Sequence, residues 1–285
     1  MAKFQMLHDL LLTQGVISRS QLQCPVSIAR RDLERVHSRR YHEAFSGDRL
    51  TRPEQRRIGL PATRELVQRT WLAVGGTLLC ARLALRQGLS CHLAGGTHHA
   101  HPDFGSGFCI FNDCAVTARV LLERNELQSV LVLDLDVHQG DGTAACFTDD
   151  PRVVTVSVHA ASNFPLRKVA SDYDLPLPDA TGDQEYLAMI GDRLPGLLDA
   201  IRPQLVLYNA GVDAHRDDRL GRLDLSDEGL MQRDRLVLDA CLRRQLPIAT
   251  VIGGGTTRLS HWCDDTPSSC VPQSNRPVSM DSESP

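Results

Sequence analysis

The sequence predicts a single α/β domain built on a mostly parallel β-sheet with helices on both faces. Short apolar runs of strand length recur through the second half of the chain, and amphipathic stretches of helical length lie between them. Buried runs that alternate with helices are typical of a parallel sheet covered on both sides. Polar clusters follow several of the runs, and this is where such sheets bind ligands.

The first third of the chain is predicted to be helical. The opening segment, MAKFQMLHDLLLTQG, carries Asp9 within its apolar part, which is typical of an amphipathic helix and not of a signal peptide. Apolar residues between Leu66 and Leu79 recur at near-helical spacing, and Gly88 is placed to end that helix.

From Gly95 onward the signals for strands and helices alternate. Apolar runs predict strands over residues 130–133, 153–158, 205–208 and 248–252. Apolar spacing predicts helices over residues 190–201 and 226–241, the second with Ser226 as its N-cap. Periodicity disappears after Gly255, so we assign residues 1–255 to the domain and expect residues 256–285 to form a disordered tail.

Composition excludes several classes of function. The formal net charge of −4 offers no broad basic face, so we expect no nucleic-acid partner. No apolar run reaches the length of a membrane span. Nine cysteines without a secretory signal predict reduced thiols in a cytoplasmic protein, with Cys109 and Cys114 as core thiols.

A cluster of metal-binding residue types follows the first predicted strand. The run VLVLDLDVHQGDG contains Asp134, Asp136, His138 and Asp141, and Asp213 follows a later strand. Alternation along extended backbone turns Asp134, Asp136 and His138 to the same side. Two carboxylates and one imidazole can bind a divalent cation and leave a position open for water. Zinc fits this set, and Fe(II) or Mn(II) remains open on ligand type alone.

Two adjacent histidines stand in a glycine-rich loop, in the run GGTHHAHPDFGSGFC. Packing alone explains His98 and His99 poorly, whereas imidazoles titrate near neutral pH and serve as acids and bases. A carboxylate bonded to each ring would set its tautomer, and Asp134 and Asp141 are the available partners.

These motifs resemble the histone deacetylase superfamily, most closely its class IV branch, which bacterial deacetylase-like proteins share. The likeness covers roughly residues 8 to 255 and is carried by LERVHSRRY, RRIGLP, GGTHHAHPDFGSGFCIFND, LDLDVHQGDG and YNAGVDAHRDDRLGRLDLS. It implies an arginase/deacetylase-like fold and zinc on Asp136, His138 and Asp213. It also implies metal-assisted hydrolysis that removes an acyl group from an acyl-lysine protein, an acylated polyamine or a similar small amide.

The resemblance also implies roles for further residues. His99 would be the general base and acid, held by Asp141, and His98 its electrostatic partner, held by Asp134. The acyl-amine tunnel would be lined by Gly107, Phe108 and Phe164. Family members also bind potassium through backbone, here around residues 134–138, with Ser157 nearby.

The chain departs from the family pattern at its ends. In TVIGGGTTRLSHWC the tyrosine expected after the glycines is replaced by Thr256, whose hydroxyl is too short to reach the same place. The closing helix and the usual first strand are missing, so we interpret the chain as a fragment or an altered reading frame at both ends. Two alternatives stay open: a zinc-binding pseudo-enzyme that recognises an acylated partner, and a two-metal hydrolase of the arginase type.

Overall fold

The computed structural model describes residues 2–256, which form two units, residues 2–23 and residues 24–256. The first unit contains helix α1 (Ala2–Thr13) and the 3₁₀ turn η1 (Arg19–Gln21), so the helix predicted at the start of the chain is confirmed. Apart from Thr256, the predicted tail lies outside the described residues. No helix between residues 2 and 256 combines the length and apolarity that a membrane crossing needs.

The second unit is built on a parallel sheet. Its strands within the described residues are β1 (Leu89–His92), β2 (Val130–Asp134), β3 (Val153–Ala160), β4 (Tyr173–Leu177), β5 (Val206–Asn209) and β6 (Ile248–Val251). They lie in the order β1-β6-β5-β2-β3-β4, and every neighbouring pair is parallel. The predicted fold class is therefore confirmed.

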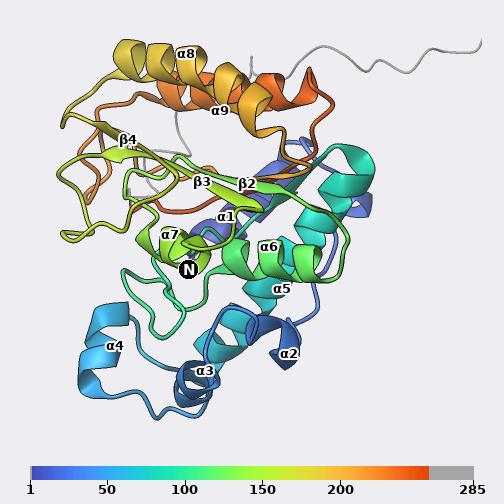
Figure 1. Ribbon diagram of the computed structural model, residues 1–285, viewed down its shortest axis with the longest axis vertical. Coiled ribbons are helices and arrows are strands. Elements are labelled where there is room, and N and C mark those ends of the chain that lie inside the picture. Colours follow the sequence, from blue (N-terminus) through green and yellow to red (C-terminus); the bar gives the residue numbers. More distant parts are fainter. Residues whose placement is uncertain (1, 257–285) are drawn as a thin grey trace, which may run out of the picture. The chain divides into compact units, whose positions relative to one another are not determined.

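Helices cover both faces of this sheet (Figure 1). The helices of the unit are α2 (Arg30–Leu33), α3 (Arg39–Ser46), α4 (Arg52–Ile58), α5 (Arg64–Gln87), α6 (Asp113–Glu123), α7 (Asp141–Phe147), α8 (Asp183–Ile201) and α9 (Asp227–Leu242). Val130 and Val132 of β2 pack with α5, α6 and α7, whereas Leu131 and Leu133 pack with α8 and α9. Side chains alternate along a strand, so helices on both sides of the sheet bury both faces of β2. Every position of the strand core is therefore apolar, and the strand reads as a continuous apolar run.

Local capping explains where two of the predicted helices begin and end. The Thr63 hydroxyl accepts a hydrogen bond from Leu66 N at the start of α5, and Gly88 ends that helix at a φ of 89°. Ser226 Oγ accepts a hydrogen bond from Gly229 N, 3.0 Å away, at the start of α9. The two predicted boundaries, the helix end at Gly88 and the N-cap at Ser226, are confirmed.

Two strands were not predicted, β1 and β4, and both lie at the edges of the described sheet. Neither consists of a continuous buried run: β1 contains Ser90 and His92, and β4 contains Pro176 and a Tyr173 that is 41% exposed. An edge strand has a neighbour on one side only and tolerates polar residues and proline. The periodic signal of a buried strand is therefore absent from both.

The central strands β2, β5 and β6 end level with one another, so the loops that follow them lie at the same edge of the sheet. Asp134, the last residue of β2, is aligned with Asn209, the last residue of β5, and Asn209 is aligned with Val251, the last residue of β6. The segments after these three strands therefore lie next to one another. This edge carries the candidate site, as expected for an open parallel sheet.

Candidate active site

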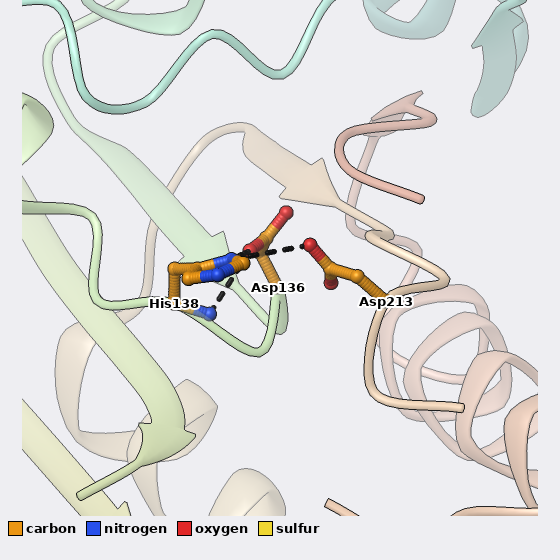
Figure 2. A group of neighbouring side chains, drawn as sticks. All are labelled: Asp136, His138 and Asp213. Carbon is orange, nitrogen blue, oxygen red and sulfur yellow. Dashed lines mark hydrogen bonds and ion pairs between the residues drawn. The ribbon is translucent and has the colours of Figure 1, made fainter. Parts of the chain in front are cut away.

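Three side chains converge beyond the ends of β2 and β5. Asp136 and His138 follow β2, Asp213 follows β5, and one potential ligand atom from each lies within 4.8 Å of the others. Nδ1 of His138 lies 3.0 Å from Asp136 Oδ1 and 3.3 Å from Asp213 Oδ2. Figure 2 shows the three side chains pointing toward one another. These are the three residues for which the resemblance implies zinc.

Backbone amides hold both carboxylates in place. Asp136 accepts hydrogen bonds from His138 N at Oδ1 and from Gly254 N at Oδ2, each at 3.0 Å. Asp213 Oδ1 accepts a hydrogen bond from Val137 N, also at 3.0 Å. The loops after β2, β5 and β6 thus hold one another through the two carboxylates, which favours a rigid site.

Two glycines leave the space that these carboxylates occupy. A Cβ atom at Gly254 would lie 2.0 Å from Asp213 Oδ2, and a Cβ atom at Gly211 would lie 2.6 Å from Asp136 Oδ2. Real side chains do not tolerate such distances, so larger residues would displace the carboxylates. Gly254 after β6 and Gly211 after β5 therefore provide the space in which the two carboxylates lie.

The charges at this cluster fit a divalent cation. Burial and the neighbouring Asp136 carboxylate raise the pKa of Asp213 to about 6. Burial disfavours the charged form of His138, yet Asp136 and Asp213 outweigh it and raise the pKa of this imidazole to about 10. The cluster thus attracts positive charge, and two oxygen donors with one nitrogen donor match the ligand set of catalytic zinc sites.

The adjacent histidines are each bonded to a carboxylate. His98 Nδ1 lies 2.6 Å from Asp134 Oδ2, and His99 Nδ1 lies 2.6 Å from Asp141 Oδ1. The two rings lie with their centroids 4.0 Å apart. These contacts are the pairings that the resemblance implies, and each leaves Nε2 as the ring nitrogen available to other groups.

The two imidazoles differ in charge. Burial opposes the charged form of His98, but Asp134 and Asp136 together raise its pKa to about 10. Burial and the neighbouring His98 lower the pKa of His99 to about 4, against the effect of Asp141. Near neutral pH the arrangement therefore combines a neutral imidazole, which can accept a proton, with a cationic one beside it.

Two of the three residues predicted to line the tunnel, Phe164 and Gly107, lie beside His99. The Phe164 ring lies edge-on to the His99 ring, with centroids 4.8 Å apart. Gly107 is adjacent to both rings, since a Cβ atom there would lie 2.7 Å from His99 Cδ2 and 3.1 Å from Phe164 Cε1. Phe108 is 54% exposed, and its ring lies beside Gly59. The lining roles of all three residues stay predictions.

The donors of Thr256 are directed to a carboxylate outside the cluster. Its backbone nitrogen lies 2.6 Å from Asp218 Oδ2, and its hydroxyl lies 2.9 Å from Asp218 Oδ1. Asp218 Oδ1 also accepts hydrogen bonds from the backbone amides of Leu220 and Gly221. The side chain of Asp218 is buried and organises this loop, because four donors surround it.

Sequence reasoning missed two histidines that support the pair. His101 Nε2 lies 2.9 Å from Asp141 Oδ2, so Asp141 contacts two imidazoles. His37 lies behind them: its Nδ1 is 3.1 Å from the His101 carbonyl oxygen, and its Nε2 accepts a hydrogen bond from Asn112 N. The HHAH run was the available signal for His101, whereas nothing local marks His37.

The potassium site implied by the resemblance stays a prediction. Ser157 Oγ lies 3.0 Å from His159 Nδ1, and the Gly140 amide donates to Ser157 Oγ at 3.4 Å.

Cys109 and Cys114 are free and buried, as expected of core thiols.

A parallel sheet with a carboxylate–imidazole cluster and a carboxylate-bonded histidine pair at its carboxyl edge defines an α/β protein with a candidate metal site of the kind that hydrolases use. The comparison with protein families gives the particular class. The histone deacetylase domain matches residues 1–262, so the chain belongs to the histone deacetylase family. Membership supports a deacetylase-type hydrolase that acts on acylated substrates.

The chain is similar to several curated proteins over most of its length. An uncharacterized protein of Picosynechococcus is 51% identical, over 92% of this chain and 87% of its own. Histone deacetylase 2 of Arabidopsis thaliana is 29% identical, over 88% of this chain and 67% of its own. The acetoin utilization protein AcuC of Staphylococcus aureus is 30% identical, over 81% of this chain and 64% of its own. The chain thus spans about two thirds of the latter two proteins.

Solved structures show the same fold. The crystal structure of a histone deacetylase homologue from Aquifex aeolicus superposes with a TM-score of 0.75 at 22% identity, over 86% of this chain and 70% of that one. The HD domain of HDA15 superposes with a TM-score of 0.74 at 23% identity, over 89% of this chain and 75% of that one.

Proposed function

We propose that the protein is a zinc-dependent hydrolase that removes an acyl group from an amine, either an acyl-lysine side chain of a protein or an acylated small amine. One observation carries the proposal: the Asp136–His138–Asp213 cluster, whose two carboxylates are buried, lies beside His99, and His99 Nδ1 contacts Asp141. A metal ligand set next to a held, neutral imidazole is what hydrolysis of an amide requires.

Under this proposal the metal-ligand candidates and the histidine pair have separate roles in hydrolysis. Asp136, His138 and Asp213 would hold the zinc ion, which would supply a Lewis acid and lower the pKa of a water molecule toward neutrality. His99 Nε2 accepts the proton of the attacking water and returns a proton to the leaving amine. Asp141 holds the His99 ring, and cationic His98, held by Asp134, adds positive charge where negative charge develops.

We further propose that turnover is slow, because Thr256 supplies no donor to the amide oxygen. Its hydroxyl and its backbone nitrogen both contact Asp218. Loss of one preorganised donor to an oxyanion costs about 10²–10³ in turnover.

Metal content and hydrolysis together test the proposal. We expect one zinc per chain, loss of that zinc in Asp136→Ala and His138→Ala, and slow release of acyl groups from an acyl-lysine panel running from acetyl to long chains. Asp217→Ala is the matched control, because Asp217 lies four residues after Asp213 and its side chain is 61% exposed. Folded protein that binds no zinc, or ligand variants that keep their zinc, would contradict the proposal.

A second candidate function is a zinc-binding pseudo-enzyme that recognises an acylated partner. The contact between Thr256 and Asp218 favours it, since the donor expected for turnover is directed elsewhere. Zinc-dependent binding of an acyl-lysine peptide without its hydrolysis would support this candidate, and hydrolysis at ordinary enzyme rates would exclude it. The two-metal alternative is disfavoured, because within residues 2–256 a single three-residue ligand group is found.

A further inference from the structure

Arg233 of α9 is the largest fully buried side chain in the described part of the chain, with an exposed fraction of 0%. A buried guanidinium is costly unless its charge is paired and its donors are bonded. Its charge is paired with Asp234, whose Oδ1 lies 2.9 Å from both Nε and Nη2 of Arg233. The hydroxyl of Tyr208 on β5 donates to the same carboxylate oxygen at 2.6 Å.

Two further contacts of Arg233 are made with backbone next to the metal-ligand candidates. Nη1 donates to the Gly211 carbonyl oxygen at 2.6 Å and to the Leu135 carbonyl oxygen at 3.3 Å. Leu135 directly precedes Asp136, and Gly211 stands two residues before Asp213. One nitrogen atom of α9 therefore joins the loop after β2 to the loop after β5.

The amide groups of the same two peptide units are also hydrogen-bonded. The Asp136 amide, in the same peptide unit as the Leu135 carbonyl, lies 3.1 Å from Asp134 Oδ1. The Val212 amide, in the same peptide unit as the Gly211 carbonyl, donates to the Gly254 carbonyl oxygen at 3.3 Å. With donors and acceptors bonded on both sides, neither peptide can rotate without breaking a buried hydrogen bond.

We propose that Arg233, oriented by Asp234 and Tyr208, is a positioning residue that sets the separation of Asp136 and Asp213 and thereby the affinity of the site for zinc. It contacts neither carboxylate and is not a ligand. The guanidinium is suited to the task because its fixed planar fork bonds two carbonyl oxygens and a carboxylate at once. A lysine offers a single nitrogen and cannot make the same set of contacts. The inference rests on the proposed function.

Zinc affinity measured by chelator competition tests this role. Arg233→Lys keeps the charge and is expected to weaken zinc binding about 10-fold, the low end of the range for residues that orient metal ligands. The visible absorption spectrum of the cobalt-loaded variant should also differ from that of the cobalt-loaded wild type, since the ligand geometry changes. Tyr208→Phe removes only the hydroxyl that contacts Asp234, so it should also weaken zinc binding, by a few-fold.

Arg119→Lys is the matched control. Arg119 also contacts a carboxylate, Asp150, and a carbonyl oxygen, that of Cys146, but neither is next to a metal-ligand candidate. It should lower the melting temperature and leave zinc affinity unchanged. If Arg233→Lys and Tyr208→Phe bind zinc as tightly as the wild type, the positioning role is wrong while the metal site stands; if Arg233→Lys does not fold, Tyr208→Phe decides alone. A wild-type chain that binds no zinc overturns both.

Discussion

The hydroxyl of Thr256 lies 2.9 Å from Oδ1 of Asp218, and the backbone nitrogen of Thr256 lies 2.6 Å from Oδ2 of the same carboxylate. Both donors that Thr256 offers are thus bonded to a carboxylate that is not part of the Asp136–His138–Asp213 cluster. The residue that follows the glycine run organises the loop around Asp218, and it contributes no hydrogen bond to the three metal-ligand candidates.

This contact predicts that the Thr256 hydroxyl has no part in turnover. Thr256→Ala should leave kcat on an acyl-lysine peptide within about two-fold of the wild type, and Thr256→Tyr should raise it, up to about 10²-fold where the phenol reaches the amide oxygen. Single-turnover assays of the zinc-loaded proteins measure both. A fall of 10²-fold or more in Thr256→Ala would identify the threonine as the missing donor and contradict the prediction.

Replacement of His99 should separate proton transfer from metal binding. His99→Ala is expected to lower kcat by about 10²–10⁴, the usual contribution of a general base, while zinc content stays at the wild-type level. His92→Asn is the control, because His92 is a partly buried histidine whose Nδ1 lies 3.1 Å from the Thr77 hydroxyl, and it is not among the metal-ligand candidates. Loss of zinc from His99→Ala would show instead that His99 is a ligand, as the two-metal alternative requires.

The glycine after β6 provides a test of the metal cradle that changes no ligand. In Gly254→Ala the added methyl group would lie 2.0 Å from Asp213 Oδ2, so the carboxylate must move and zinc affinity should fall by 10-fold or more. Gly191→Ala is the matched control, since Gly191 lies within α8 and nothing is found within 4 Å of its added Cβ atom.

The control should leave zinc affinity unchanged and stabilise the fold by about 0.5–1 kcal/mol, the usual gain when alanine replaces glycine in a helix. Isothermal titration with zinc and urea denaturation give the two quantities. Equal zinc affinity in both variants would show that the carboxylates are not confined by the glycine run.

Stability should fall in mild acid because of His37. Burial lowers the pKa of His37 to about 4, against an ordinary value of 6.5. As the pH falls below 6.5 the unfolded chain binds a proton that the folded chain refuses, so the contribution is complete above pH 6.5 and is lost between pH 6.5 and 4. Its size is about 3 kcal/mol.

Urea denaturation of the wild type and of His37→Gln at several pH values between 7.5 and 4 measures this effect. Glutamine does not titrate, so the variant should be less stable at pH 7.5 and should lose less stability on acidification. Parallel curves for the two proteins would assign the acid sensitivity to other groups.

The fold class and the central strands could be predicted because burial leaves a periodic trace in the chain. β2 is covered on both faces and is apolar at every position from Val130 to Leu133, so it was visible without coordinates. β1 and β4 at the sheet edges carry serine, histidine and proline, and no local pattern separates them from loops. Helix boundaries at Gly88 and Ser226 follow from backbone chemistry that acts within a few residues.

The candidate site also contains residues that the sequence predicts and contacts that it does not. Asp136 and His138 stand two residues apart, so their proximity follows from local geometry. Asp213 was recognised because it follows a predicted strand, and the histidine pair because it stands in a glycine-rich loop; the motif likeness added the roles of these residues. The contacts of Asp218 with Thr256 and of Arg233 with Leu135 and Gly211 join segments far apart in the chain. They depend on the strand order β2, β5, β6 and on where α9 packs, because long-range hydrogen bonds arise from the packing of whole elements and leave no periodic pattern in the residues that make them.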